Sequence, residues 1–372
     1  MSPAAGPPRP PVAVHQFVPT LNPRDATGSH TLLVRDTLRA AGWPSEIFAE
    51  AIHDDLASEA HKHWMYPDHS AEGDVAIYQF STSSAVAAYL AERSLPLVID
   101  FHNFTGPEHF EGWEPHTAER AARAHDDLAL LAPRAVLGMA DSRFNEAVLQ
   151  RAGCRRTEVI PVLVDYERIA AAPDARLEAE LAAAKREGGT DILFVGRIVP
   201  SKAQEELVKV LWAYRRLYDP AARLHLVGGT SSFTYLKSLR AYIGELGLSG
   251  AVRITGEVSD AALAAYFGAA DAYLSLSVHE GFGVPLVEAM MAGVPVVARK
   301  AGAIAETVGD GALLLEAGDP SYVAAALRRV ITDATLRDHL RAAGQRRAAT
   351  FACETVAAQL VAAVASVAGA PR

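Results

Sequence analysis

Short apolar runs alternate along the chain with longer stretches in which apolar residues recur at helical spacing. This alternation is typical of a parallel sheet whose strands are joined by crossover helices. The first half predicts strands over 11–17, 45–49, 74–80, 96–103, 134–142 and 157–164. Helices are predicted between them over 30–42, 83–94 and near 116–132.

The same rhythm restarts after a charged, alanine-rich stretch, 175–190, which ends in a Gly-Gly pair and is interpreted as the link between two domains. Strands follow over 191–197, 223–229, 251–258, 272–278, 294–299 and 312–316, and helices over 203–218, 235–247 and 260–270. The terminal stretch 320–366 has helical spacing throughout. The expected fold class is therefore α/β, with two successive Rossmann-like domains.

Composition narrows the class of protein. Half of the 372 residues are hydrophobic and 21% are charged, as in soluble globular proteins. No apolar run approaches the roughly 20 residues of a membrane-spanning helix, so no transmembrane segment is expected. The first eleven residues, MSPAAGPPRPP, lack the basic and apolar regions of a signal peptide and are expected to be a disordered proline-rich lead-in.

Charge and cysteine content add two further expectations. A net charge of -9 disfavours broad nucleic-acid binding, which depends on neutralising phosphates with Lys and Arg. Two cysteines make a disulfide framework unexpected and favour a reducing, cytoplasmic compartment.

The standard dinucleotide and P-loop motifs are absent. The loop after the first strand, VPTLNPRDATGSH, contains no GxGxxG, and none occurs elsewhere in the sequence. The segment GRIVPSK (196–202) lacks the second glycine of a P-loop. No dinucleotide cofactor is therefore expected, although several loops remain suited to a phosphate.

The stretch HEGFGVPLVEAMMAGVPVVA (279–298) has the most specific pattern in the chain. Its glycines let a ligand approach the backbone at the start of a helix, and Pro285 fits a first helical position. Such a helix start offers unpaired N–H groups to a phosphate. Glu280 and Glu288 lie on either side and could accept hydrogen bonds from sugar hydroxyls. Spacing alone equally allows a solvated loop residue and a helix-dipole partner.

The run E-GFGVPLV-E resembles the E-x7-E motif of retaining glycosyltransferases of the GT-B type, particularly glycosyltransferase family four. The resemblance implies that Glu280 contacts hydroxyls of the donor sugar and that Glu288 binds the nucleotide ribose. It also implies that the backbone between them holds the pyrophosphate. The corresponding donor-binding residues are Gly281, Phe282, Gly283, Val284 and Leu286.

Other segments agree with the same family. FVGRIVPSK is similar to its element bearing an arginine and a lysine, which implies that Arg197 and Lys202 stabilise the departing diphosphate; read alone, both could be surface charges. DFHNFTGPEHF is similar to a YHN-T-P segment, which implies that His102 touches the donor sugar. Phe101 and the additional Gly106 depart from that pattern, and a lone histidine is usually structural.

Three segments give weaker expectations. RDATGSHT resembles the amino-terminal glycine loop, so the backbone at Gly28 would approach the phosphates or the acceptor, although a simple turn and helix cap fits equally. ADSRFN (140–145) is similar to an S-x-x-N segment beside the site. TGEVSD corresponds to a loop near the nucleobase, with contacts assigned to Gly256, Glu257 and Val258.

The histidine-rich HKHWMYPDH (61–69) is expected to be a polar loop and not a metal site.

The resemblance implies a GT-B fold with an acceptor domain over 12–174, a nucleotide-sugar donor domain over 175–348 and a terminal helix, 349–368, that packs back on the first domain. It implies a retaining, metal-independent hexosyltransferase with His102, Glu280, Arg197 and Lys202 as catalytic residues. No cofactor is expected beyond the donor substrate, and UDP is slightly favoured over GDP.

Several alternatives stay open at this point. The acceptor could be a glycan precursor or a small molecule, and the acceptor could attack from the front face or through a covalent intermediate. The chain could instead be an inactive nucleotide-sugar-binding or scaffolding protein of the same fold. A sugar-nucleotide epimerase or a phosphorylase is the other alternative.

Overall fold

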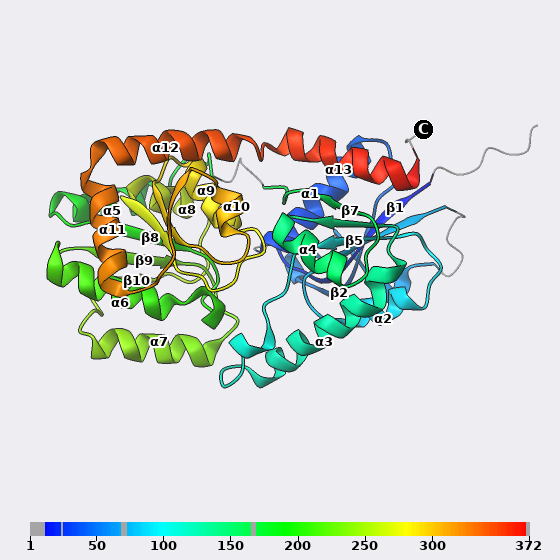
Figure 1. Ribbon diagram of the computed structural model, residues 1–372, viewed down its shortest axis with the longest axis horizontal. Helices are drawn as coiled ribbons and strands as arrows, with labels where there is room; N and C mark the ends of the chain where they lie inside the picture. Colours follow the sequence, from blue (N-terminus) through cyan, green and yellow to red (C-terminus); the bar gives the residue numbers. More distant parts are fainter. Residues whose placement is uncertain (1–11, 24, 68–72, 165–168, 370–372) are drawn as a thin grey trace, which may run out of the picture.

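The computed structural model describes residues 12–23, 25–67, 73–164 and 169–369 (Figure 1). The expected disordered lead-in, residues 1–11, lies outside the described residues. Two α/β domains lie side by side, each built on its own sheet, and both sheets are parallel throughout their described pairings. The expected fold class is confirmed.

The first domain has, within the described residues, seven parallel strands in the order β3-β2-β1-β4-β5-β6-β7. The order places the carboxyl ends of β1, β4, β5 and β6 next to one another at one edge. The strands are β1 (Val14–Leu21), β2 (Ile47–Ile52), β3 (His61–Lys62), β4 (Val75–Phe80), β5 (Leu97–Phe101), β6 (Leu137–Ala140) and β7 (Thr157–Val159).

Helices cover both faces of this sheet. They are α1 (Ala26–Ala40), α2 (Ala85–Ala91), α3 (Pro115–Leu131) and α4 (Arg143–Arg151), with short 3-10 turns η1 (Asp54–Leu56), η2 (His63–Met65), η3 (Pro107–His109) and η4 (Ala132–Arg134). Helix α4 was not predicted, because its sequence RFNEAVLQR carries few apolar residues; its start is fixed by the Ser142 side chain, which caps the Asn145 N–H.

The histidine-rich segment differs from its prediction. A polar loop was expected over 61–69, but His61 pairs with Phe48 in the two-residue edge strand β3, and η2 follows. Two residues are too few for a period-two pattern to appear in the sequence. Residues 68 and 69 lie outside the described residues.

The second domain has, in the part of the chain that the structure describes, six parallel strands in the order β10-β9-β8-β11-β12-β13. The strands are β8 (Asp191–Val195), β9 (Arg223–Val227), β10 (Val252–Ile254), β11 (Ala272–Ser275), β12 (Val296–Arg299) and β13 (Ala312–Leu315). The helices are α5 (Ala175–Arg186), α6 (Gln204–Leu217), α7 (Phe233–Glu245), α8 (Asp260–Ala269), α9 (Val284–Met291) and α10 (Ile304–Val308), with a 3-10 turn η5 (Pro200–Lys202).

The stretch 175–190 is more than a connecting segment. Its helix α5 is capped by Asp174, buries Leu181 in the core of the second domain and lies against α8. The link between the domains therefore lies before α5, around the end of β7, and again in the carboxyl-terminal helices.

The chain ends in three helices, α11 (Pro320–Thr332), α12 (Ala334–Ala349) and α13 (Cys353–Ala368). Figure 1 shows α12 along the second domain and α13 continuing across the first. Val356 and Leu360 of α13 are buried in one cluster with Val34 and Leu38 of α1. The expected return of the terminal helix to the first domain is confirmed.

The stretch Ala334–Ala368 is long and apolar enough to cross a membrane by length and composition alone. A single stretch of this kind is weak evidence, since the core helix of a soluble protein meets the same criterion. The expectation that no segment spans a membrane stays a prediction.

Candidate functional site

The turn that follows β11 meets the first domain across the cleft between the two sheets. The Ser142 hydroxyl donates a hydrogen bond of 2.8 Å to the Gly281 carbonyl oxygen. A Cβ added to Gly281 would lie 2.8 Å from the His102 carbonyl oxygen and 3.0 Å from Asn103 Cβ. Only a glycine allows the two domains to approach this closely, so Gly281 is an interdomain contact as well as a candidate donor contact.

A second set of contacts joins the two domains. The loop after β5 carries Trp113, whose ring packs edge-on against Tyr235 of α7 at 5.3 Å. Next to it the Ser232 hydroxyl donates to the Glu114 carboxylate over 2.9 Å. Figure 1 shows the start of α3 close to α7 in this region, and Ser232 and Tyr235 lie at the start of α7. At least two separate sets of contacts therefore join the two domains in this structure.

The glycine-rich turn adopts the local geometry that its sequence predicts. Gly283 has a φ of 92° and caps α9, while Gly293 has a φ of 70° at the exit of the helix. Both values lie in the left-handed region that favours glycine. Pro285 lies one position further into the helix than expected, because α9 begins at Val284.

The structure brings Lys202 and Glu280 together. The Lys202 ammonium lies 2.6 Å from a carboxylate oxygen of Glu280, and their side chains are 19% and 15% exposed. Lys202 ends η5 after β8, whereas Glu280 follows β11, the neighbouring strand in the sheet. A half-buried cation and carboxylate therefore meet at the start of α9, where the helix N–H groups emerge.

Glu288 does not fit the alternative of a simple surface partner for the helix dipole, because it is only 3% exposed. The hydroxyl of Tyr273 donates to the Val195 carbonyl, and burial raises its pKa well above the usual value, with Glu280 and Glu288 adding to the effect. Both glutamates thus act on one buried tyrosine, which lies in β11 and bonds the last residue of β8. A buried carboxylate needs polar partners to offset its desolvation.

Phe282 and Leu286 contribute their side chains to the core of the second domain and not to the cleft. Phe282 packs edge-on against Phe351, and its carbonyl accepts a hydrogen bond from the Thr307 hydroxyl. Val284 is partly buried against the same core. Any donor contact by these residues must therefore come from their backbone.

Arg197 is exposed after β8, and it faces Asp25 of the first domain. Burial raises the pKa of Asp25, while the Gly28 N–H, Arg197 and His102 oppose that shift. Sequence reasoning missed Asp25; its position as the cap of α1 was the available signal.

Gly28 has a structural role of its own. Its N–H donates to the Asp25 carboxylate over 2.6 Å. A Cβ at Gly28 would lie 1.8 Å from the Asn22 carbonyl oxygen. Packing against the preceding loop therefore suffices to explain the glycine, and its contact with phosphate stays a prediction.

His102 lies at the carboxyl end of β5 with its side chain 7% exposed. Its Nε2 is 2.6 Å from Gln79 Oε1, and its Nδ1 is 3.8 Å from an Asp141 carboxylate oxygen. Burial lowers the pKa of His102, but Asp100 and Asp141 outweigh it, and the net pKa is raised. The imidazolium form is therefore favoured by its surroundings.

Polar residues around His102 come from several strands and were not predicted. Gln16, Gln79 and Asp100 are buried inside otherwise apolar strands. A polar side chain at a buried strand position costs free energy unless it is hydrogen bonded, so these three positions were the available signal. The S-x-x-N segment was correctly singled out: Asn145 bonds Asp141 and accepts from the Asn103 amide at 2.6 Å.

Among the described residues, His30, Asp100 and His102 place potential metal-ligating atoms within 4.8 Å of one another. The Leu163 N–H donates to His30 Nδ1 over 3.0 Å, so the proton of His30 is on Nε2. That Nε2 lies 3.0 Å from Asp100. A metal ion would have to displace this proton, and the geometry is that of a hydrogen-bonded pair.

The loop assigned to the nucleobase lies at the carboxyl end of β10. Gly256 has a φ of 72°, and its carbonyl accepts from the Gly228 N–H over 3.0 Å. A Cβ at Gly229 would lie 2.8 Å from Glu257 Cγ. Residues 256–258 therefore lie at the same edge of the sheet as the glycine loop after β9. Strand β10, which precedes them, is three strands away from β11, which precedes Glu280.

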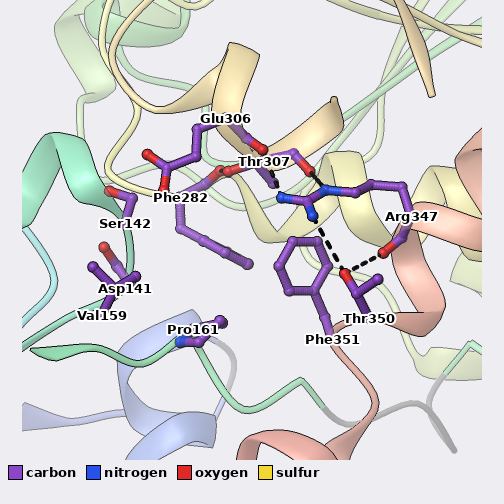
Figure 2. A pocket seen from close by; sticks show the side chains of 10 residues that line it. All are labelled: Asp141, Ser142, Val159, Pro161, Phe282, Glu306, Thr307, Arg347, Thr350 and Phe351. Atoms are coloured by element: carbon purple, nitrogen blue, oxygen red, sulfur yellow. Dashed lines mark hydrogen bonds between the residues drawn. The ribbon is translucent and has the colours of Figure 1, made fainter. Parts of the chain in front are cut away.

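A cavity of about 210 Å³ lies behind the Gly281 turn, at the link between the domains (Figure 2). Its polar groups bond one another: both Glu306 carboxylate oxygens accept from the Arg143 N–H, and Arg347 donates to the Glu306 and Thr307 carbonyls. The lining residues are Asp141, Ser142, Val159, Pro161, Phe282, Glu306, Thr307, Arg347, Thr350 and Phe351.

Ala203 follows Lys202 and has a left-handed backbone, with a φ of 51° and a ψ of 45°. This conformation costs a non-glycine residue about 1–2 kcal/mol. We expect Ala203→Gly to raise the free energy of unfolding by up to about 1 kcal/mol, because glycine removes the strain but gains entropy when unfolded. Thermal and urea unfolding would measure the change.

The matched control is Ala241→Gly, at an exposed position inside α7. There the same substitution is expected to lower stability by about 1 kcal/mol, since the backbone is already helical. Equal effects at the two positions would contradict the strain assigned to Ala203.

Comparisons with known proteins agree with this architecture. Residues 178–347 match the family model described as glycosyl transferases group 1. A D-inositol 3-phosphate glycosyltransferase of Geodermatophilus obscurus is 36% identical over 218 residues, which cover 56% of this chain and 47% of that protein. One of Nocardioides sp. is 32% identical over 303 residues, covering 77% and 66%. The chain thus matches about half to two thirds of the length of these curated relatives.

The fold of nearly the whole chain is similar to that of a solved two-domain structure. The crystal structure of Anabaena HepE (Alr3699) in complex with UDP-glucose superimposes with a TM-score of 0.75 at 21% identity, and the match covers 95% of this chain and 99% of that chain. The expectation of a GT-B glycosyltransferase is confirmed, whereas the E-x7-E motif, retention of configuration and the roles of individual site residues stay predictions. The chain belongs to the GT-B glycosyltransferases, with the glycosyl transferases group 1 module in its second domain.

Proposed function

We propose that this protein is a glycosyltransferase that moves a hexose from a nucleoside-diphosphate donor to a hydroxyl acceptor with retention of anomeric configuration. The observation that carries the proposal is the Lys202–Glu280 pair at the start of α9, with the buried Glu288 in the same helix. All three lie in the region that matches the glycosyl transferases group 1 model. A UDP-sugar is the favoured donor, supported by the UDP-glucose bound to the structural neighbour HepE.

The chemistry follows from the charges at this edge of the sheet. The bond between the sugar C1 and the diphosphate oxygen breaks, and negative charge develops on the leaving diphosphate. Lys202, Arg197 and the N–H groups of α9 stabilise that charge. The acceptor hydroxyl then forms the new C1–O bond on the same face, and its proton passes to the leaving phosphate oxygen.

The first domain supplies the remaining surface around the reacting carbon. Gly281 brings the turn between β11 and α9, residues 276–283, against His102 and Asn103. We call this segment the donor turn. Its close contact with the first domain shields the site from water. Glu280 accepts hydroxyl hydrogen bonds from the donor sugar in this proposal, and Glu288 binds the ribose. In this proposal the reaction needs no metal ion, because Lys202 and Arg197 provide the positive charge. The proposed compartment is the cytoplasm.

Nucleotide binding tests the donor site directly. Titration calorimetry with UDP, GDP, ADP and TDP is expected to show binding of UDP in preference to the others. Arg197→Ala and Glu288→Ala should each weaken UDP binding at least about 10-fold, since a hydrogen bond to a charged group is worth about 1.5–3 kcal/mol. Arg253→Ala, at an exposed arginine paired with Glu180, is the matched control and should bind UDP normally.

The outcomes separate the alternatives. Preferential GDP binding would keep the transferase and overturn the choice of UDP. Absence of binding by every nucleotide would contradict the donor site. Nucleotide-sugar binding without transfer to any hydroxyl acceptor would favour an inactive binding protein, and turnover that depends on inorganic phosphate would indicate a phosphorylase.

A further inference from the structure

A chain of side-chain amides inside the first sheet ends at His102. The Thr31 backbone carbonyl accepts from Gln16 Nε2 over 3.0 Å, and a carbonyl can only accept. This fixes the Gln16 amide, whose Oε1 accepts from Gln79 Nε2 over 2.9 Å. Gln79 Oε1 then faces His102 Nε2 at 2.6 Å. Two acceptors cannot bond each other, so Nε2 of His102 carries a proton.

The electrostatics of Asp100 agree with this orientation of Gln79. Gln79 also hydrogen bonds the Asp100 carboxylate, its register partner on β5. An ionised carboxylate only accepts, so the Gln79 NH₂ group must face it, and Oε1 is left for His102. Asp100 is ionised because His102, His30 and Gln79 outweigh its burial and lower its pKa.

We propose that Gln79 is a positioning residue that holds a proton on Nε2 of His102, so that His102 gains and loses its second proton only at Nδ1, beside Asp141. The assignment of the Nε2 proton stands on the hydrogen bonds that link Thr31, Gln16, Gln79 and His102. Its consequence for turnover rests on the proposed glycosyltransferase function.

The position of that second proton matters because Asp141 is connected to the donor turn. Asp141 Oδ1 accepts from Asn145, which also bonds Asn103, and the adjacent Ser142 donates to the Gly281 carbonyl. The charged groups that face His102 are Asp100 on β5, Asp141 after β6, Asp25 at the start of α1 and His30 in α1. The three carboxylates favour the imidazolium, and the Leu163 N–H donates to Nδ1 of His30.

Nitrogen NMR of ¹⁵N-histidine-labelled protein tests the assignment without any donor. His102→Asn identifies the His102 signals by their loss. In wild-type protein above its titration midpoint, His102 is expected as the Nε2–H tautomer, and His30 is expected to carry a proton on Nε2 as well. Gln79→Met should allow the Nδ1–H tautomer of His102, whereas Gln79→Glu should raise the midpoint, because a carboxylate stabilises the imidazolium.

Three results would overturn the proposal: a neutral His102 protonated on Nδ1, identical His102 signals in wild type and Gln79→Met, or loss of both Nε2–H signals on adding one equivalent of Zn²⁺. The last result would make His30, Asp100 and His102 a metal site. Because Gln79→Met could unfold the domain, Gln79→Glu, which keeps a hydrogen bond to His102, provides an independent measurement.

Turnover of UDP-glucose gives the second test. Gln79→Met should shift the pH dependence of kcat by more than half a pH unit while KM changes less than twofold, because Gln79 lies behind His102 and does not touch the donor. Gln359→Met, at an exposed position on α13, is the control and should leave the profile unchanged. An unchanged profile in Gln79→Met contradicts the positioning role. If wild-type protein does not turn over any nucleotide sugar, the proposed function fails. The NMR experiment still tests the position of the His102 proton in that case, because it needs no substrate.

Discussion

Replacing Lys202 by alanine is expected to lower kcat for UDP-glucose turnover about 10²–10³-fold, the usual loss when one preorganised group is removed from a developing oxyanion. Lys202 is 19% exposed and contacts Glu280 in the turn that precedes α9, so its charge acts in a partly desolvated site. The substitution also leaves Glu280 without its cation at 2.6 Å. KM should change less than kcat, because the interaction strengthens as charge develops on the diphosphate.

A double-mutant cycle separates these two effects. Lys202→Ala, Glu280→Gln and the double variant are measured by UDP release from UDP-glucose. The two substitutions are expected to be non-additive by about 1–3 kcal/mol, because the side chains are in direct contact. The control is Lys300→Ala, a lysine that is 53% exposed and paired with Glu316 on the same domain. That variant should keep wild-type turnover.

Two outcomes would contradict the role of this pair. Equal turnover by Lys202→Ala and Lys300→Ala would show that Lys202 is only a surface charge. Full turnover by Glu280→Gln together with strict additivity would remove Glu280 from the donor site, leaving the pair as a structural contact.

The parts of the site that depend on local geometry could be predicted from the sequence. Gly283 and Gly293 take left-handed conformations at the two ends of α9, as their positions around an apolar helix indicated. Lys202 and Glu280 could be assigned to one site because each follows a strand of the second sheet. Parallel strands bring their carboxyl ends to one edge.

The surroundings of His102 could not be predicted in the same way. Gln16, Gln79, Asp100 and Asp141 come from β1, β4, β5 and the loop after β6, and their contacts depend on strand order and register. A period-two pattern shows which face a residue occupies but not which strand is its neighbour. The left-handed backbone of Ala203 could not be predicted either, because an alanine in a sequence does not indicate a positive φ.

Gly281→Ala is expected to reduce kcat/KM for UDP-glucose about 100-fold, the effect of displacing reacting groups by roughly 1 Å. Gly281 is outside the left-handed region, so alanine is allowed by the backbone and only space decides the result. The new Cβ would lie 2.8 Å from the His102 carbonyl oxygen and 3.0 Å from Asn145 Nδ2. Neither the backbone of β5 nor the buried Asn145 can move freely, so the donor turn must withdraw from the first domain.

Gly250→Ala is the matched control, because its Cβ would meet nothing within 4 Å and its φ is also ordinary. Gly281→Ala should bind UDP within about threefold of wild type, since Arg197, Lys202 and Glu288, the main proposed nucleotide contacts, lie in the second domain. It should also show a larger radius of gyration in small-angle scattering. Normal turnover with an unchanged radius would show that the cleft tolerates the extra methyl group. Loss of UDP binding with an unchanged radius would instead mean that Gly281 acts through the donor and not through the contact between the domains.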